Sequence, residues 1–571
     1  MSVGLVGSGA GADAVAAALG DADATVDRAG PGDLERSHDL ALVVDRAGAT
    51  TIELVAEAAA DAGIPWFAVE LGGIGGYPVV DAAVTGFDPD GACYDCLRDR
   101  VASNVPEDAD PVAAPSDATA RFAGAVAGRR AVQFLDPAEP DPLGRVVELP
   151  YAERTLLPVP GCRCGGERDR VLDQGDIDRS VEQSLSRAER GLDDRLGIVA
   201  EVGEAESYPA PYYVARLCDT ATFADATAAR RGGGLDPGWD ASFMKALGEA
   251  YERYCAGVYH AAEFTVAAAE ELDDAVAPSS FVRPTDWADN PDAEERPWVD
   301  GIRLDPGERI SVPAELVHYP PPERTIRPAI TTGLGLGNSS VEALLSGLYE
   351  VIERDASTIA WYSTFEPLGL AVEDEQYREL AARAGANGLD ATALLLTQDV
   401  DVPVVAVAVR RDEWPKLALG TAAHLDPARA ARSALAEAVQ NWVELRGMGA
   451  GDAADVDGAY GRYADEPATV EPFVSPDQRV PAASVGPDSV PEGREHVGAV
   501  LDRLDEAGVT AYAVRTTTRD VQKLGFEAVR VLVPSAQPLF FDGAYFGERA
   551  RTVPGRLGFE PRLDREHHPY P

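Results

Sequence analysis

Residues 331 to 356, TTGLGLGNSSVEALLSGLYEVIERDA, space an amide and three carboxylates as a helix would gather them. At about 100° per residue, a helix opened by the glycine run brings the four side chains into an arc of roughly 120°. Clustered carboxylates repel each other unless a cation lies between them, and Mg²⁺ carrying nucleotide phosphates suits such a ligand set. The alternative is an acidic face that only meets solvent. The four residues are Asn338, Glu342, Glu350 and Glu353.

Two other segments resemble this one. Residues 232 to 255, GGGLDPGWDASFMKALGEAYERYC, also run from a glycine-rich turn into an E-x-x-E-R helix, with Glu249 and Glu252. In a third segment, GTAAHLDPARAARSALAEAVQ, Glu437 and Gln440 are three residues apart. Any single pair of this kind is usually a surface pair in an acidic protein. Two E-x-x-E-R helices that follow glycine-rich turns favour one shared site instead.

The elements that position these residues need apolar faces of their own. In the helix expected after the glycine run, five apolar residues fall opposite the carboxylates, so that one face can pack into a core. The chain reads as an α+β protein with an amino-terminal α/β scaffold and a larger α+β domain. The expected bounds are 1–165 for the scaffold, 166–194 for a charged linker and 195–571 for the second domain. The five apolar residues are Leu344, Leu345, Leu348, Val351 and Ile352.

Two close cysteine pairs lie in the first domain, in GACYDCLRDR and VPGCRCGG. One pair alone could be buried or redox-active. Two pairs flanked by glycine and proline suit four thiolates on a tetrahedral Zn²⁺ that leaves no position open for catalysis. The predicted zinc ligands are Cys93, Cys96, Cys162 and Cys164.

The first domain opens with a strand, a glycine turn at Gly7, Gly9 and Gly11, and a helix. Apolar runs at 40–44 and 66–70 predict further parallel strands. The turn is similar to a nucleotide-binding fingerprint. A glycine turn between a strand and a helix also serves close packing, and we expect that role here.

The composition excludes several classes of function. The 571 residues carry a formal charge of −46, and 45% of them are hydrophobic, which indicates folded domains. Such a balance is typical of proteins adapted to multimolar salt, and it argues against binding nucleic acid through phosphate contacts. Six cysteines are too few for a disulfide scaffold. Neither a targeting segment nor a membrane span is visible, so we expect a cytoplasmic protein.

Residues 195–571 resemble the YcaO family of ATP-dependent peptide-modifying enzymes, through the three segments quoted above and VRVLVPSAQPLFF. The first half resembles the zinc-binding scaffold of cyclodehydratase partner proteins, a relative of the ubiquitin-activating fold. The resemblance implies that Arg354 touches phosphate and that Glu437 and Gln440 lie near the active site. It also implies that a proline-rich tail reaches the catalytic centre, here through Pro569 and Pro571. The residues implied to hold ATP through Mg²⁺ are Glu249, Glu252, Asn338, Glu342, Glu350 and Glu353.

The implied activity is ATP-dependent cyclodehydration of Cys, Ser or Thr in a ribosomally made precursor peptide, in thiazole/oxazole-modified peptide biosynthesis. One alternative is thioamide formation with external sulfide, and another is a non-catalytic peptide-binding scaffold with a decayed ATP site. Because no leader-binding module is visible ahead of the first strand, we expect a separate leader-binding protein. We also expect a flavin dehydrogenase as a further partner, and a homodimer.

The sequence predicts that nucleotide binds in the second half and not at the first glycine turn. Binding of an ATP analogue should survive Gly9→Val and be lost in Glu350→Gln or Glu353→Gln, because the amide keeps the side chain's shape and removes its charge. Isothermal titration calorimetry with Mg²⁺ and the analogue measures this. The opposite pattern would move the site to the first domain.

Overall fold

The structure is a computed structural model that describes residues 1–571 except 35, 107–111, 113, 151, 174 and 288–289. The chain divides into two compact units, each of which gathers segments that are separated in sequence. Residues 166–194, predicted as a linker, contribute to both units. Unit 1 comprises residues 1–168, 189–201 and 217–227, and unit 2 comprises residues 169–188, 202–216 and 228–571.

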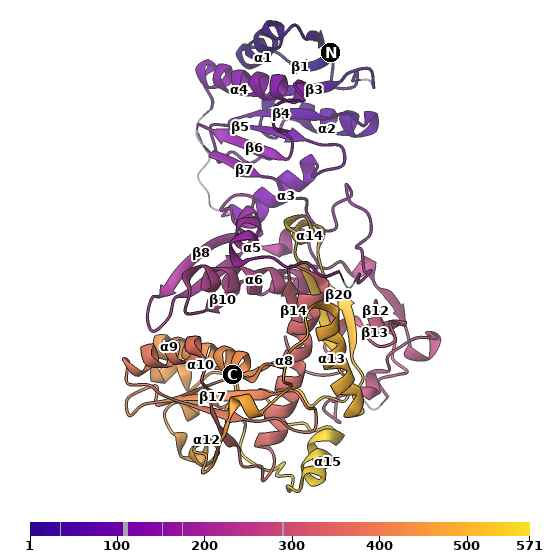
Figure 1. The fold of residues 1–571 in the computed structure, drawn as a ribbon. Helices are drawn as coiled ribbons and strands as arrows, with labels where there is room; N and C mark the ends of the chain where they lie inside the picture. The colour runs from indigo at the N-terminus through magenta and orange to yellow at the C-terminus, as the bar shows by residue number, and fades with distance from the viewer. Residues whose placement is uncertain (35, 107–111, 113, 151, 174, 288–289) are drawn as a thin grey trace. The chain divides into compact units, whose positions relative to one another are not determined.

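Unit 1 is built on a seven-stranded sheet of order β2-β1-β3-β4-β5-β6-β7 (Figure 1). The first four strands are parallel and the last three are added antiparallel, so the expected parallel α/β core is present. The strands are β1 (Ser2–Gly7), β2 (Thr25–Arg28), β3 (Leu40–Arg46), β4 (Trp66–Leu71), β5 (Ala82–Phe87), β6 (Arg145–Leu149) and β7 (Ala152–Thr155), and the helices are α1 (Ala10–Asp21), α2 (Thr50–Ala62), α3 (Tyr94–Asn104) and α4 (Asp117–Leu135).

The glycine turn of unit 1 serves helix packing. Helices α1 and α4 lie against each other, and a Cβ atom at Gly124 in α4 would lie 2.1 Å from the carbonyl oxygen of Gly11. A Cβ atom at Gly11 would in turn lie 2.9 Å from a methyl carbon of Val44 in β3. The two helices approach this closely only because neither glycine has a side chain. This packing favours the structural interpretation of the turn over a phosphate site.

Unit 2 contains three sheets, of order β10-β9-β8, β11-β12-β20-β21-β14 with β13 beside β12, and β18-β17-β16-β15-β19. The first sheet belongs to unit 2 apart from residues 199–201 and 217. The strands are β8 (Val199–Glu206), β9 (Tyr212–Leu217), β10 (Arg231–Leu235), β11 (Thr265–Ala267), β12 (Arg296–Arg303), β13 (Arg309–Pro313), β14 (Leu334–Gly337), β15 (Leu368–Ala371), β16 (Asp390–Leu395), β17 (Val404–Arg410), β18 (Leu417–Ala423), β19 (Arg479–Pro481), β20 (Tyr512–Arg515) and β21 (Glu527–Leu532).

Helix α8 (Ser340–Trp361) is the central element of unit 2 (Figure 1). It contacts β14 and β21 of one sheet and β17 and β18 of another, which buries 17 of its 22 residues. Within the described residues, no helix is both long and apolar enough to cross a membrane. The other helices are α5 (Val181–Ala188), α6 (Trp239–Gly257), α7 (Ala314–Val317), α9 (Glu375–Gly385), α10 (Pro427–Ala453), α11 (Tyr460–Tyr463), α12 (Glu471–Val474), α13 (Gly493–Glu506), α14 (Arg519–Leu524) and α15 (Glu548–Leu557).

The glycine runs expected to form turns before α6 and α8 are strands instead, β10 and β14. Each strand is the surface on which the following helix packs. A Cβ atom at Gly234 would lie 2.4 Å from the amide nitrogen of Ala246, and one at Gly335 would lie 2.2 Å from the carbonyl oxygen of Ala343. Strand β18 packs equally closely on the helix that follows it, because a Cβ atom at Gly420 would lie 2.3 Å from the amide nitrogen of Ala438 in α10. Three strands that contain glycine therefore allow three helices to pack with their backbones against the strand backbones.

This close packing predicts a stability effect. Gly335→Ala should lower the free energy of unfolding by about 2 kcal/mol or more, because backbone rather than a flexible side chain blocks the new methyl group. Gly385→Ala is the matched control, since nothing lies within 4 Å of its Cβ position at the exposed end of α9. Thermal denaturation followed by circular dichroism compares the two variants. Equal melting temperatures would contradict the packing argument.

Candidate functional site

Helices α6, α8 and α10 each carry a glutamate that is hydrogen-bonded to a backbone N–H group at the strand before it. The three bonds have similar lengths and join residues 16 or 17 positions apart. Each bond fixes the orientation of one carboxylate relative to its own strand–helix unit. The bonds run from Gly233 N to Glu249 Oε2 (2.9 Å), from Gly333 N to Glu350 Oε2 (3.0 Å) and from Thr421 N to Glu437 Oε2 (2.7 Å).

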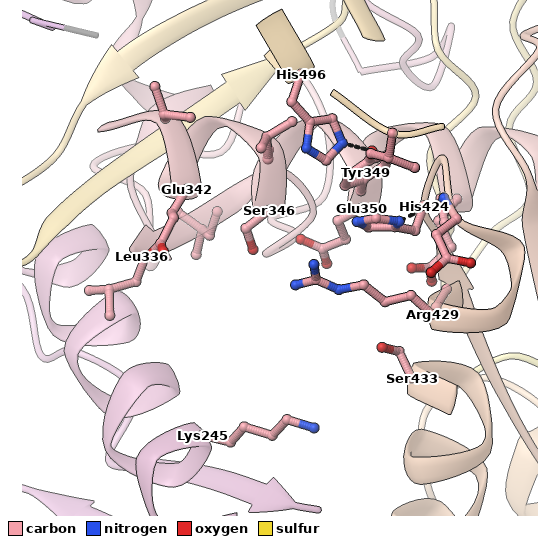
Figure 2. A pocket seen from close by; sticks show the side chains of 18 of the residues that line it. Lys245, Leu336, Glu342, Ser346, Tyr349, Glu350, His424, Arg429, Ser433 and His496 are labelled. Atoms are coloured by element: carbon pink, nitrogen blue, oxygen red, sulfur yellow. Dashed lines mark hydrogen bonds between the residues drawn. The ribbon is translucent and has the colours of Figure 1, made fainter. Parts of the chain in front are cut away.

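These helices surround a cavity of about 1260 Å³ in unit 2 (Figure 2). Helix α8 supplies most of one wall, since the successive positions that face the cavity all lie on one side of the helix. The loop after β18 and the start of α13 complete the lining. The three helices contribute six glutamates to the lining: Glu249, Glu252, Glu342, Glu350, Glu353 and Glu437.

Burial raises the pKa of Glu252 and Glu353. It raises the pKa of Glu353 to about 8, with Arg354 opposing and Glu437 and Glu350 adding to the shift. Burial likewise raises the pKa of Glu252 to about 7, opposed by Arg253. Like charges in a low-dielectric site disfavour ionisation, and a cation placed among them reverses the effect. The site is therefore suited to a positively charged guest.

The cavity also contains five cationic side chains, of which four are paired with carboxylates of the chain. Arg429, on the first turn of α10, makes no ion pair or hydrogen bond through its side chain within the described residues, and it extends into the open centre of the cavity (Figure 2). An arginine without a partner in a carboxylate-rich cavity can bind an anionic ligand. The paired cations are Lys245 with Asp236, Arg253 with Glu249 and Glu252, Arg354 with Glu353 and Glu437, and Arg432 with Asp374.

Three residues lie elsewhere than the helical spacing predicts. Asn338 precedes the N-cap residue Ser339, so it is outside α8; its amide bonds to Glu342 and its Oδ1 accepts from Ser184. Leu345, expected on the packed face, lines the cavity. Gln440 bonds to Glu444 and is not among the described residues that line the cavity.

The sequence did not predict a group of aromatic and histidine side chains that line the cavity. There the phenol of Tyr349 contacts His496 Nε2 at 2.5 Å, and His424 lies beside them. Burial lowers the pKa of His424 to about 3, and Arg429 adds to the shift, so the imidazole is neutral at physiological pH. Tyr349 and Arg429 could have been found from helical periodicity, because Tyr349 falls one turn before Glu353 and Arg429 two turns before Glu437. Nothing local marks the histidines.

The carboxyl-terminal residues dock beside α8, α10 and α11. His568 and Tyr570 are fully buried, and His568 Nε2 donates to the carbonyl oxygen of Phe540 at 2.8 Å. The Tyr463 hydroxyl donates to the carbonyl oxygen of His567 at 2.7 Å. Pro569 and Pro571 adjoin a narrow space beside residues of β18 and α10. Arg354 adds to the lowering of the pKa of His568, after burial and His567.

The four predicted cysteines come together in unit 1. Their sulfurs all lie within 4.8 Å of one another, with Cys93 and Cys162 at 3.5 Å and Cys96 and Cys164 at 3.4 Å. A tetrahedral Zn²⁺ with bonds of about 2.3 Å requires sulfurs about 3.8 Å apart, so the quartet fits this ion. The sulfurs of Cys162 and Cys164 raise the pKa of the Cys96 thiol, because thiolates so close repel without a cation between them.

The family model described as YcaO cyclodehydratase, ATP- and Mg²⁺-binding, matches residues 236–537, which is more than half of the chain. The chain belongs to the YcaO family. This YcaO protein is thus an ATP-dependent cyclodehydratase. An uncharacterised protein of Methanothermobacter thermautotrophicus is 30% identical over 327 residues, which cover 54% of this chain and 82% of that protein.

Two solved structures share the fold of the YcaO protein. A heterocyclase in complex with substrate and cofactor matches with a TM-score of 0.74 at 20% identity, covering all of this chain and 85% of that one. The heterocyclase TruD matches with a TM-score of 0.66 at 18% identity, covering all of this chain and 84% of that one. Both matches support the mixed α+β architecture with an amino-terminal scaffold.

The residues of the YcaO cavity fit the nucleotide and metal that the family description names. Oxygen donors from three helices suit Mg²⁺, and the free guanidinium of Arg429 suits a phosphate. The volume exceeds what a single ion needs and is adequate for a nucleotide.

The cysteine quartet predicts a zinc content of about one ion per chain. Cys93→Ser should lower the content strongly, because three thiolates bind Zn²⁺ less tightly than four. Cys255→Ala is the matched control, since this buried cysteine lies in α6 and outside the quartet. Elemental analysis of the purified proteins measures the ratio. Equal zinc in the wild type and Cys93→Ser, or none in the wild type, would sink the assignment.

Proposed function

We propose that this protein converts Cys, Ser or Thr residues of a ribosomally made precursor peptide to azolines. The side chain attacks the preceding amide carbonyl and loses its proton. The γ-phosphoryl group of ATP is transferred to the resulting oxyanion, which releases ADP. The oxygen then leaves as phosphate, with loss of the amide proton, to give the azoline. The single observation that carries the proposal is the cavity in which three helices gather six glutamates. Membership of the YcaO family supports the same reaction class.

In this proposal the cavity glutamates hold ATP through Mg²⁺, whose charge offsets that of the phosphates. Arg354 and Arg429 are placed to contact phosphate from α8 and α10. Asn338 acts through Glu342, to which both its amide N–H and its side chain donate, and is a positioning residue. The proposed Mg²⁺ ligands are Glu249, Glu252, Glu342, Glu350 and Glu353, and Glu437 joins them.

The tail is proposed to position the reacting amide. Pro569 is buried and Pro571 partly buried beside β18, the strand whose Thr421 bonds to both Glu353 and Glu437. The tail therefore shares a wall with the proposed phosphate site. Prolines restrict the chain before it docks, which lowers the entropy lost on ordering. Pro569 and Pro571 remain predicted catalytic residues on this basis.

The partners follow from the proposed reaction. A precursor peptide is the substrate, and a separate leader-binding protein would bring it to the cavity. A flavin dehydrogenase would oxidise azolines to azoles. The zinc of unit 1 is proposed to be structural, since four cysteines leave no open position. A homodimer, the cytoplasm as location and the relation of unit 1 to the ubiquitin-activating fold stay predictions.

The test pairs the full-length protein with the precursor peptide encoded beside its gene, with ATP and Mg²⁺. Mass spectrometry should show loss of one water per ring together with release of ADP. Exchange of oxygen for sulfur in the presence of sulfide would identify thioamide formation instead. Consumption of no ATP with an intact peptide would support a non-catalytic scaffold.

Removal of residues 568–571 should lower the rate of ring formation by roughly 100-fold, because misplacing the reacting group by about 1 Å has such an effect. Affinity for an ATP analogue should change little, since the carboxylates lie on other elements. Tyr570→Phe is the matched control, because the buried Tyr570 hydroxyl has no hydrogen-bond partner within the described residues. A truncated protein that melts at the wild-type temperature and cyclises at the wild-type rate would contradict a role for the tail.

A further inference from the structure

A second cavity in unit 2 is separated from the carboxylate cavity by Arg354, which lines both. It measures about 20 Å³ and lies between the middle of α8, the end of β21 and the loop before β14. A space of this size holds one or two water-sized guests. Among its lining residues are Arg327, Thr332, Arg354 and Gln537.

Arg327 is buried there without a counter-ion. Its exposed fraction is 7%, and within the described residues no carboxylate lies in ion-pair distance of its guanidinium and no hydrogen bond satisfies it. The group lies over the ring of Phe281 at 5.9 Å, near the outer limit of a cation–π contact. A buried charge that is neither paired nor hydrogen-bonded costs several kcal/mol.

Glu315, the acidic residue that acts on Arg327, does not pair with its guanidinium. The carboxylate of Glu315 accepts hydrogen bonds from the backbone amides of Thr325, Ile326 and Arg327 and from the Thr325 hydroxyl, at 2.7 to 3.2 Å. These bonds fold residues 325–327 around Glu315 and leave the Arg327 guanidinium on the side of the small cavity.

A second buried arginine, Arg530, lies close enough for Arg327 to affect its pKa. Arg530 is 2% exposed and donates to the carbonyl oxygens of Ile330 and Thr331 at 2.9 and 2.7 Å, without an ion pair in the described chain. Burial lowers the pKa of Arg530 to about 9, and Arg327 adds to the shift. The Tyr545 hydroxyl nearby is buried and has no partner within the same residues. Glu350 and Glu252 oppose this shift in Arg530, whereas Arg327 has no carboxylate in ion-pair distance within the described residues and so lacks a counter-ion.

We propose that Arg327, with Thr332, forms a site for one small inorganic anion in the small cavity beside the carboxylate cavity. The volume of about 20 Å³ suits a halide ion, and the larger phosphate requires the lining to open. The anion can therefore come from the medium as a halide or from ATP turnover as phosphate. The site goes beyond the proposed function, since a halide can occupy it without nucleotide or peptide.

The decisive experiment is a crystal structure of the full-length protein in sodium bromide, with no nucleotide. An anomalous bromide peak is expected within hydrogen-bond distance of the Arg327 guanidinium, and it should be absent in Arg327→Met. A parallel crystal in sodium phosphate distinguishes the sources, because a tetrahedral peak identifies phosphate and an empty cavity there identifies a halide site. Absence of any anion at Arg327 in both crystals of the wild type would overturn the proposal.

Thermal denaturation provides the second arm, at equal ionic strength in sodium bromide and sodium gluconate. The wild type should melt about 2 °C higher in bromide, with saturation as the bromide concentration rises. Arg324→Met should keep this difference, because Arg324 is an exposed arginine of the same loop. Arg327→Met should lose it. Equal bromide dependence in the wild type and Arg327→Met would also count against the site, and neither result depends on whether ATP binds.

Discussion

The candidate active site depends on one repeated hydrogen bond, from a strand amide to a glutamate on the helix that follows. Gly233, Gly333 and Thr421 each supply that amide. Because each carboxylate is tied to its own strand, it cannot swing away from its neighbours to relieve their repulsion. These hydrogen bonds can form only because glycines in the strands let the helix backbones approach closely. In unit 2 the close packing of the helices on the strands therefore also fixes the geometry of the cavity carboxylates.

That constraint has an electrostatic consequence. Carboxylates held together in a buried cavity ionise less readily, as the raised pKa values of Glu252 and Glu353 show. Arg253 and Arg354 follow directly in sequence and offset part of the cost through ion pairs. The charge that these ion pairs leave uncompensated faces the cavity, where Arg429 and a cationic ligand can supply positive charge. The two units thus use the same principle, since the cysteine quartet also gathers groups that repel each other without a cation.

Much of this could be predicted from the sequence. The cysteine pairs identify their quartet because each pair is local and the flanking glycines and proline favour tight turns. The E-x-x-E-R segments predict their carboxylate faces because helical periodicity is local too. Asn338 was misplaced by the same reasoning, since the periodicity does not show that Ser339 is the N-cap and that the helix begins only at Ser340. The glycine runs were read as turns because glycine is depleted in strands, and here close helix packing overrides that preference.

The sequence by itself determined the residue types that can bind a metal or a nucleotide and the helix faces that carry them, because both depend on neighbours within a few positions. Only the tertiary structure decided which charges lack partners. Arg429 and Arg327 differ from other arginines of the chain solely in what surrounds them, and their surroundings come from segments far apart in sequence. The same holds for the buried tail, whose partner Phe540 lies 28 residues from His568. The burial of a side chain and the pairing of its charge depend on residues from the whole fold, so a local sequence pattern does not predict them.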